Sequence, residues 1–204
     1  FKVWRYVGYD RASGAIKVRY FESAGENQHV LFDFLMYLWS KQDSVLMHGV
    51  PRYMLWDKGS AMTSSAIKNL ALHLEVELLD HAAGNARAKG GVENANNIVE
   101  TQFECRLRFQ PVDNVEELNA AAEAWAEAYN ANLIPHQDTR LRRPGLTVPV
   151  ARYDLWQLIR AEQIPLLPSI EVCRALMASK EVDRVVRSDR CISFKDQSAD
   201  SYLR

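Results

Sequence analysis

The stretch Tyr53-Met54-Leu55-Trp56-Asp57-Lys58-Gly59-Ser60 joins a short apolar run to an acidic residue and a glycine. A run of this length and composition is typical of a buried strand, and the polar residues that follow it are typical of a turn. This arrangement places the Asp57 carboxylate at the carboxyl end of a strand. Open α/β sheets carry their active sites at that end of their strands, so Asp57 is the first candidate functional residue.

The residues around this strand predict a mixture of strands and helices. Alternating apolar residues at 1–7 and 15–21, with a turn at 10–14, predict an antiparallel hairpin. Apolar residues at three-to-four spacing predict a helix over 30–39, and Ser64 or Ser65 is expected to cap the next helix. A second short strand is expected at 76–79.

The chain beyond 79 predicts a loop followed by two helices. Residues 81–91 are small, polar and glycine-bearing, which predicts a mobile loop. A helix is expected from Val92 to about Phe109, and Asp113 or Asn114 is expected to cap a further helix that reaches Tyr129. This order of elements is typical of an α/β, ribonuclease-H-like mixed sheet with flanking helices, which we assign to residues 1–132.

Residues 133–204 differ in composition from the first part of the chain. Prolines punctuate this part, and Arg140, Arg142 and Arg143 lie between two of them. We expect a helical linker with short helices at 150–161 and 169–179. An alternating strand at 182–194 is expected to begin a small β-barrel of which only this part is present.

The overall composition excludes several classes of protein. The 204 residues contain 25 Lys and Arg against 26 Asp and Glu, which argues against a histone-like binder of nucleic acid. No apolar run approaches the ~20 residues of a membrane span, so no membrane partner is expected. The 3 cysteines lack a metal-binding spacing and suit a reducing cytoplasm. The sequence starts inside the first predicted strand, and we expect it to be a fragment of a longer protein.

Asp57 and Glu93 are the most informative pair of acidic residues. Asp57 is expected to end a strand and Glu93 to open a helix, with thirty-five residues between them. Two carboxylates brought together from such elements can bind Mg²⁺ through oxygen and leave coordination positions open for phosphate and water. The alternative is that Asp57 is a turn residue and Glu93 a carboxylate favoured by the helix dipole.

Three motifs together resemble the catalytic core of retroviral integrases and bacterial insertion-sequence transposases. They are the loop Gly49-Val50-Pro51-Arg52, the turn Trp56-Asp57-Lys58-Gly59-Ser60 and the segment Lys89-Gly90-Gly91-Val92-Glu93-Asn94. The likeness spans roughly residues 1–129. The tail, with Trp156, Ile159 and residues 184–187, resembles more weakly the linker and β-barrel of phage Mu-type transposases.

The resemblance implies a DDE-type enzyme for DNA transposition or integration. It implies that Asp57 and Glu93 are catalytic and, with a third carboxylate, hold two Mg²⁺ or Mn²⁺ ions. The family carries that third residue, an Asp, on its first strand, so we expect it upstream of Phe1, which leaves this fragment incomplete. Asp10 is the less favoured alternative. Lys58 stands where the family usually has Asn.

The resemblance also implies DNA contacts and a homo-oligomer assembled on two DNA ends. Asn96 and Asn97 follow Glu93 on one helical face and suit contacts to phosphate and sugar. Lys58, Asn85, Arg87 and Lys89 are the other candidate DNA contacts, and the last two place cations near the metal glutamate. Two alternatives stay open: a ribonuclease-H-like nuclease without strand transfer, and a non-catalytic DNA-binding or assembly module.

Overall fold

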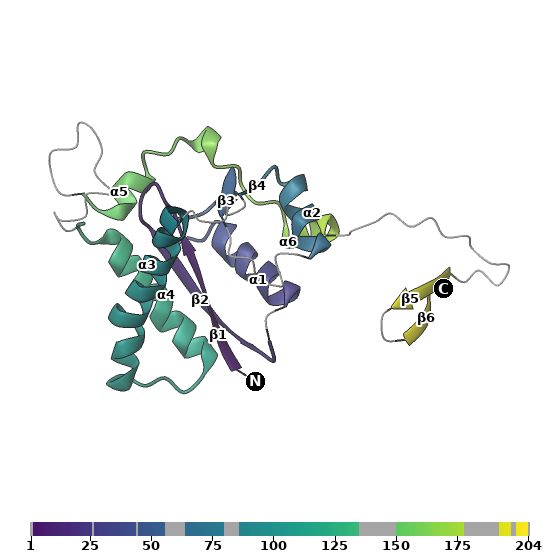
Figure 1. The fold of residues 1–204 in the computed structure, drawn as a ribbon, viewed down its shortest axis with the longest axis horizontal. Helices are drawn as coiled ribbons and strands as arrows, with labels where there is room; N and C mark the ends of the chain where they lie inside the picture. The colour runs from purple at the N-terminus through teal and green to yellow at the C-terminus, as the bar shows by residue number, and fades with distance from the viewer. Residues whose placement is uncertain are drawn as a thin grey trace.

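Figure 1 shows helices packed around the first two pairs of strands in chain order. This computed structural model describes residues 2–25, 27–43, 45–55, 64–79, 86–134, 150–177, 192–196 and 199–203. Within these ranges the strands form three two-stranded sheets, β1–β2, β3–β4 and β5–β6. The predicted mixed α/β class is confirmed. The single mixed sheet is not found among the described residues, because β1 pairs only with β2 and β3 only with β4.

The described elements follow one another in the order that Figure 1 labels. They are β1 (Lys2–Tyr9), β2 (Ile16–Ser23), α1 (Gln28–Trp39), β3 (Tyr53–Leu55), α2 (Ser65–His73), β4 (Glu77–Leu79), α3 (Ala86–Gln102), the 3₁₀ helix η2 (Glu104–Arg108), α4 (Val115–Ala131), α5 (Arg152–Trp156), the 3₁₀ helix η4 (Ala161–Gln163), α6 (Ile170–Leu176), β5 (Ile192–Asp196) and β6 (Ala199–Leu203). Within the described ranges, no helix combines the length and apolar character of a membrane span.

The hairpin predicted at the start of the chain is confirmed. β1 and β2 are antiparallel, with Val7 opposite Val18 and Arg5 opposite Tyr20. The Asp10 amide donates to the Ala15 carbonyl at 2.9 Å and closes the turn. Gly14 adopts a φ of 77° in this turn, a backbone conformation that glycine adopts without a steric cost.

A first hydrophobic core joins α1 and α2 to the parallel pair β3–β4. The Asn27 side chain caps α1 by accepting from the amides of His29 and Val30, and Ser64 caps α2 as expected. Both caps satisfy amides that the helix itself leaves unpaired. The helices bury Leu31, Phe34, Leu35, Ile67 and Leu70 against Met54 of β3 and Val76 before β4. β3 is therefore held by side chains from both helices.

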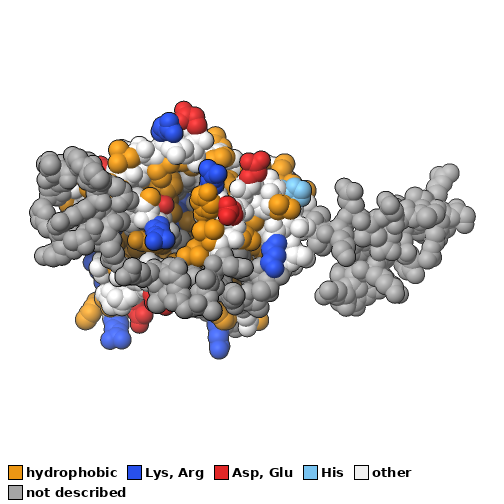
Figure 2. Space-filling view, turned by 45° about the horizontal axis from the view of Figure 1, so that its top comes forward, with side chains coloured by type: hydrophobic (Ala, Val, Ile, Leu, Met, Phe, Trp, Pro, Cys, Tyr) orange, Lys and Arg blue, Asp and Glu red, His pale blue; other side chains and the backbone are white. Residues whose placement is uncertain are grey.

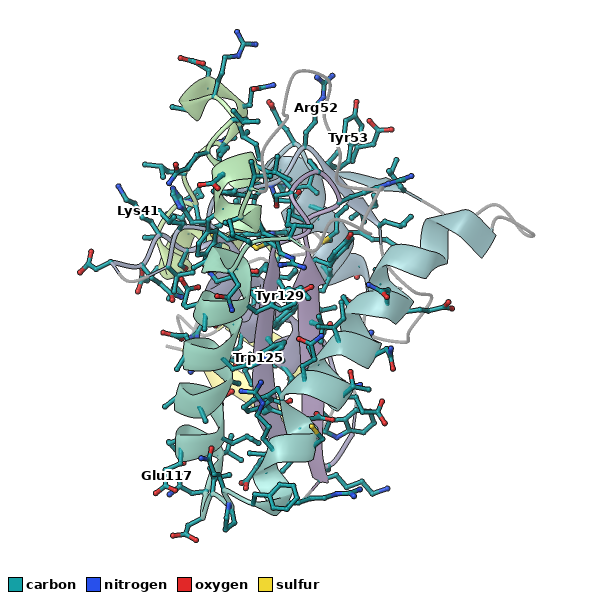
Figure 3. The ribbon with its side chains drawn as sticks, turned by 90° about the vertical axis from the view of Figure 1, so that its left-hand side faces the viewer. Lys41, Arg52, Tyr53, Glu117, Trp125 and Tyr129 are labelled. Carbon is teal, nitrogen blue, oxygen red and sulfur yellow. The ribbon has the colours of Figure 1, made fainter. Side chains whose placement is uncertain are left out.

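A second hydrophobic core joins α3 and α4 to the β1–β2 hairpin. Figure 3 shows these two helices in front of the strands, with Trp125 and Tyr129 of α4 between them. The buried members of this core are Ile16, Val18, Tyr20, Ala95, Val99, Phe103, Leu118, Ala122 and Ala126. Trp125 stacks on Tyr129 with ring centroids 5.5 Å apart and also contacts Phe103. The helix predicted to begin after Asp113 or Asn114 and to reach Tyr129 is confirmed as α4.

Two asparagines of α4 cover the outer edge of β2. Asn130 accepts from the Ile16 amide at 2.9 Å and donates to the Ile16 carbonyl at 2.8 Å. Asn119 makes the same pair of bonds with Tyr20, at 2.8 and 2.9 Å. Each side-chain amide therefore replaces a neighbouring strand at one residue of the edge. At these two residues the amide and carbonyl are already bonded and are not open to another strand.

The predicted start of the helix that carries Glu93 is wrong. α3 begins at Ala86 rather than Val92, so residues 86–91 are helical and do not belong to a mobile loop. Residues 81–85 of the predicted loop lie outside the described part. The sequence Ala86-Arg87-Ala88-Lys89 consists of strong helix formers, which offset the cost of Gly90 and Gly91 in a helix interior. The predicted continuous helix to Phe109 is interrupted at Phe103, where the 3₁₀ helix η2 follows.

Residues 150–177 contain shorter helices than the sequence predicts. α5 covers Arg152–Trp156 and α6 covers Ile170–Leu176, the latter capped by Ser169. The prolines at 165 and 168 keep the chain between them non-helical. Of the predicted strand at 182–194, residues 182–191 lie outside the described part. β5 pairs with β6 in a hairpin, and no barrel is confirmed. The division at residue 132 stays a prediction.

Lys17 of β2 is buried, although the alternating pattern predicts a half-buried strand with its polar residues toward solvent. Its side chain is 1% exposed, because α1 covers one face of β2 and α4 the other. The ammonium donates to the carbonyls of Tyr37 at 3.0 Å and Leu38 at 3.2 Å, at the carboxyl end of α1. Burial lowers the pKa of Lys17 from 10.5 to about 8, partly offset by the charge of Glu127.

The burial of Lys17 predicts a pH-dependent stability. Between pH 8 and 10.5 the unfolded chain binds a proton that the folded Lys17 has released, so the stability that Lys17 contributes rises with pH over this interval. Relative to Lys17→Met, the free energy of unfolding of the unmodified protein should rise by on the order of 3 kcal/mol between pH 8 and 10.5. Urea unfolding at several pH values measures this difference. Lys68→Met, at an exposed position of α2, is the control, and a pH-independent difference for Lys17→Met would contradict the prediction.

Candidate active site

β3 leads the chain toward the first candidate carboxylate. Tyr53 and Leu55 pair in parallel with Glu77 and Leu79 of β4. Asp57 follows the last residue of β3 by two positions, and it lies outside the described residues together with Lys58. The predicted strand that leads to Asp57 is confirmed at residues 53–55. The chain direction therefore agrees with a carboxylate beyond the carboxyl end of a parallel strand.

α3 carries the second candidate carboxylate on its exposed face. Ala95, Val99 and Phe103 bury the opposite face of this helix against β1, β2 and α4. Glu93 and Asn97 are exposed one turn apart, as the helical repeat requires. No described residue hydrogen-bonds to the Glu93 carboxylate or pairs with it, and the residue is exposed. Carboxylate oxygens of this kind are the donors that Mg²⁺ and Mn²⁺ prefer.

Gly91 determines how closely this part of α3 approaches the hairpin. A Cβ at Gly91 would lie 3.0 Å from Cε1 of Tyr9 on β1, closer than ordinary van der Waals contact. A glycine at this position therefore lets the helix lie against the Tyr9 ring two residues before Glu93. The sequence shows the glycine pair as a loop signal, and its role in packing becomes visible only when the neighbouring strand is in place.

The candidate DNA contacts are distributed unevenly over the described residues. Asn96 donates from Nδ2 to the Val92 carbonyl at 3.1 Å, so its amide is partly directed back along its own helix. Asn97 leaves its side chain exposed. Arg87 and Lys89 lie in the first turn of α3, whereas their side chains, like all of Asn85, lie outside the described part. The structure thus places four of the six candidates on the Glu93 helix, Arg87 and Lys89 by backbone alone and Asn96 and Asn97 with their side chains. Lys58 and Asn85 lie outside the described residues.

Asp10, the alternative early carboxylate, has a structural partner. One of its oxygens, Oδ2, accepts from the Ser13 amide at 2.7 Å and from the Ser13 hydroxyl at 2.6 Å. These bonds are typical of an acidic residue that stabilises a turn. Within the described ranges, no group of three or more His, Cys, Asp and Glu side chains could hold a metal ion.

A partly buried polar cluster that no local sequence pattern indicates lies between α4 and α5. The Tyr153 hydroxyl donates to Glu127, and Asn130 donates to the same hydroxyl at 3.4 Å. Burial raises the pKa of Glu127, and it also raises the pKa of Tyr153, an effect that its hydrogen bond to Glu127 reinforces. These groups connect α4 to α5 in the interior. No local sequence signal marks them, because their partners lie 23 or more residues away.

The visible surface above β3 and β4 is not uniformly basic. Figure 2 shows single Lys and Arg side chains separated by hydrophobic and acidic ones. Arg52 and Tyr53 are both exposed, with the guanidinium 5.4 Å from the ring centroid, and they point outward in Figure 3. This face of the described residues therefore offers separate cations rather than one continuous basic patch.

The arrangement of described elements is that of an integrase-like fold. A chain of the simian T-cell lymphotropic virus intasome in complex with PP2A regulatory subunit B56 gamma is similar, with a TM-score of 0.56 and 19% identity over 80% of this chain. The catalytic core domain of BIV integrase is also similar, with a TM-score of 0.52 and 16% identity. That match covers 76% of this chain and 85% of the core domain.

At 19% and 16% identity, these similarities concern the fold alone. This chain spans about half of the intasome chain that it matches, 51% of its length. No family model matches the sequence, and no curated protein matches it either. The expected likeness to an integrase core is therefore confirmed for the fold.

Proposed function

We propose that this chain belongs to a DNA transposase or integrase that cleaves and joins DNA strands. The observation that carries the proposal is the integrase-like fold, in which Glu93 is exposed on a helix packed against β1 and Asp57 follows β3. The two motifs that resemble the catalytic core of such enzymes thus fall on elements of a fold that is similar to that core. The intasome neighbour additionally supports assembly on DNA as part of the proposal.

Asp57 and Glu93 would hold Mg²⁺ or Mn²⁺, two ions with a third carboxylate. The exposed Glu93 carboxylate, which pairs with no described side chain, fits this role, because a hard cation requires an accessible anionic oxygen. When bound, such ions supply activation of the attacking hydroxyl and stabilisation of the leaving oxygen in an in-line displacement at phosphorus. Asp57 and Glu93 would orient that site, and Arg87, Lys89 and Asn97 would position the DNA backbone beside it.

The third carboxylate is proposed to come from a segment outside the described residues that pairs with the outer edge of β1. Asp10 is occupied by the turn, as described above. Asn119 and Asn130 cover the outer edge of β2, whereas β1 pairs with no described strand on its other side. Tyr6 of β1 and Met54 of β3 belong to the same hydrophobic core, so an added strand beside β1 would lie on the side of β3.

A cleavage and joining assay with the full-length protein tests this function. The protein is incubated with supercoiled plasmid and a labelled DNA duplex with a free 3′-hydroxyl, in Mg²⁺, in Mn²⁺ or with chelator. We expect the label to become covalently attached to the plasmid in either metal and not with chelator. Nicking without attachment would favour a ribonuclease-H-like nuclease. Binding of DNA without nicking or attachment would favour the non-catalytic assembly module and contradict the proposal.

A further inference from the structure

Glu93 and the strand that leads to Asp57 belong to different halves of the described fold. Glu93 lies on α3, which packs with α4 on the β1–β2 hairpin. Asp57 follows β3, which packs with α1 and α2 in the other core. A metal ion shared by these carboxylates would require the halves to keep a fixed relative position, since oxygen–Mg²⁺ bonds are only about 2.1 Å long. On one side, Tyr6 and Phe21 of the hairpin pack against the α1 core and connect the halves.

Residues 150–177, here called the brace, connect the halves a second time. Figure 1 shows the brace crossing the top of the molecule, from α5 near α4 to α6 beside α2. At its start, the Arg152 guanidinium lies 3.8 Å from the Tyr129 ring centroid and donates to the Tyr129 carbonyl at 3.2 Å. Tyr153 is buried with Ala15 and Met47 and donates to Glu127. The start of the brace is therefore attached to α4 and the hairpin turn.

The end of the brace is attached to the other half. Cys173 of α6 is 0% exposed and belongs to the same core as α1 and α2. The Arg174 guanidinium lies 5.8 Å from the ring centroid of Phe32 on α1. Leu167, Leu176 and Met177 also pack against this core. The neighbouring Leu166 and Val172 are 65% and 47% exposed. The attachment of the brace to this core therefore depends on the side chains that pack against it and not on every apolar residue of the segment.

The middle of the brace contacts the loop that leads into β3. The Val50 amide donates to the Pro165 carbonyl at 2.9 Å. Gly49 adopts a φ of 93°, and a Cβ there would lie 1.9 Å from Cγ2 of Ile164. No residue other than glycine could therefore keep this contact unchanged. Tyr53, the first residue of β3, is three positions beyond Val50, so the brace is bonded to the chain just before the strand that leads to Asp57.

We propose that the brace is a positioning element that holds β3, the strand that leads to Asp57, at a fixed place relative to α3, the helix that carries Glu93. The expected effect of the brace on metal binding rests on the proposed function. The structural part of the proposal stands on contacts to α4, to residues 49–50 and to the α1–α2 core. Leu167 and Ile164 act as positioning residues, because their described contacts are with the α1–α2 core and with the loop before β3.

The test compares Leu167→Asp with Leu166→Asp in the full-length protein. The first places a charge against the α1–α2 core and should detach the brace, whereas the second adds the same charge at an exposed neighbour. Amide hydrogen exchange should become at least tenfold faster at residues 50–55 for Leu167→Asp and stay unchanged for Leu166→Asp. Exchange in α4 reports whether the rest of the fold is intact. If Leu167→Asp unfolds the protein, Ile164→Ala removes the contact at Gly49 without a charge.

Mn²⁺ affinity of the same variants tests the consequence for the site. Detaching the brace should weaken Mn²⁺ binding about tenfold or more, the size of effect seen for outer-shell partners of metal ligands. Faster exchange confined to 150–177, or faster exchange at 50–55 with unchanged Mn²⁺ affinity, would overturn the proposal. If the unmodified protein binds no Mn²⁺, the proposed function fails, and exchange at 50–55 alone then decides whether the brace holds β3.

Discussion

Glu93→Gln in the full-length protein is expected to reduce DNA cleavage and joining more than about 100-fold, because even outer-shell partners of a metal ligand are worth 10–100-fold. Glutamine keeps the size and hydrogen-bonding capacity of the side chain but removes the negative charge that a hard cation requires. DNA binding should be largely retained, since it depends on phosphate contacts made by other residues. Rates of cleavage and joining in Mg²⁺ and the dissociation constant for DNA measure the two effects separately.

Glu100→Gln is the matched control for this substitution. Glu100 is exposed on the same helix, two turns beyond Glu93 and therefore about 10 Å further along the axis. It should retain the rates of the unmodified protein. Normal cleavage and joining by Glu93→Gln would show that Glu93 is only a carboxylate on the helix surface, and the assignment of this site would then be wrong.

Asn130→Ala is expected to lower the free energy of unfolding by about 2–4 kcal/mol, because a buried polar group left without its partner costs about 1–3 kcal/mol. The substitution leaves both the amide and the carbonyl of Ile16 without the bonds that Asn130 makes, at a position that is 0% exposed. It also removes a donor to the Tyr153 hydroxyl. Chemical denaturation measures the change.

Asn132→Ala, two residues further along, is the control for Asn130. Asn132 is exposed at the end of α4, where its side chain makes no bond within the described residues. Its substitution should change stability by less than about 0.5 kcal/mol. Equal effects of the two substitutions would contradict the view that the asparagine side chain replaces a neighbouring strand at the edge of β2.

Local signals in the sequence predicted the elements that depend on near neighbours. The alternation at 1–7 and 15–21, the cap at Ser64 and the cap at Asn114 each correspond to an observed element. The predicted start of α3 at Val92 is wrong, because the pair Gly90 and Gly91 is typical of a loop in the sequence but is helical in the structure. Gly91 instead provides room for the Tyr9 ring, which is distant in sequence. A single sequence pattern does not reveal such an approach.

Long-range contacts account for the other differences between the predicted and the observed structure. Lys17 alternates with apolar neighbours, and nothing in the pattern shows that helices cover both faces of β2. The attachment of residues 150–177 to both cores depends on Tyr153, Ile164 and Cys173, whose partners lie far away along the chain. The candidate carboxylates were found from motif spacing instead. The structure describes the Glu93 helix and the strand before Asp57, whereas Asp57 itself lies outside the described residues.

The most direct test of the account is the position of Mn²⁺ in crystals of the full-length protein, located by anomalous diffraction. The account predicts an Mn²⁺ ion with oxygens of both Asp57 and Glu93 at roughly 2.0–2.3 Å, the range of bonds between hard cations and oxygen. The central claim would be contradicted if the carboxyl groups of Asp57 and Glu93 lay more than about 10 Å apart and Mn²⁺ were bound to neither. No single ion can bridge that distance with bonds of about 2.1 Å.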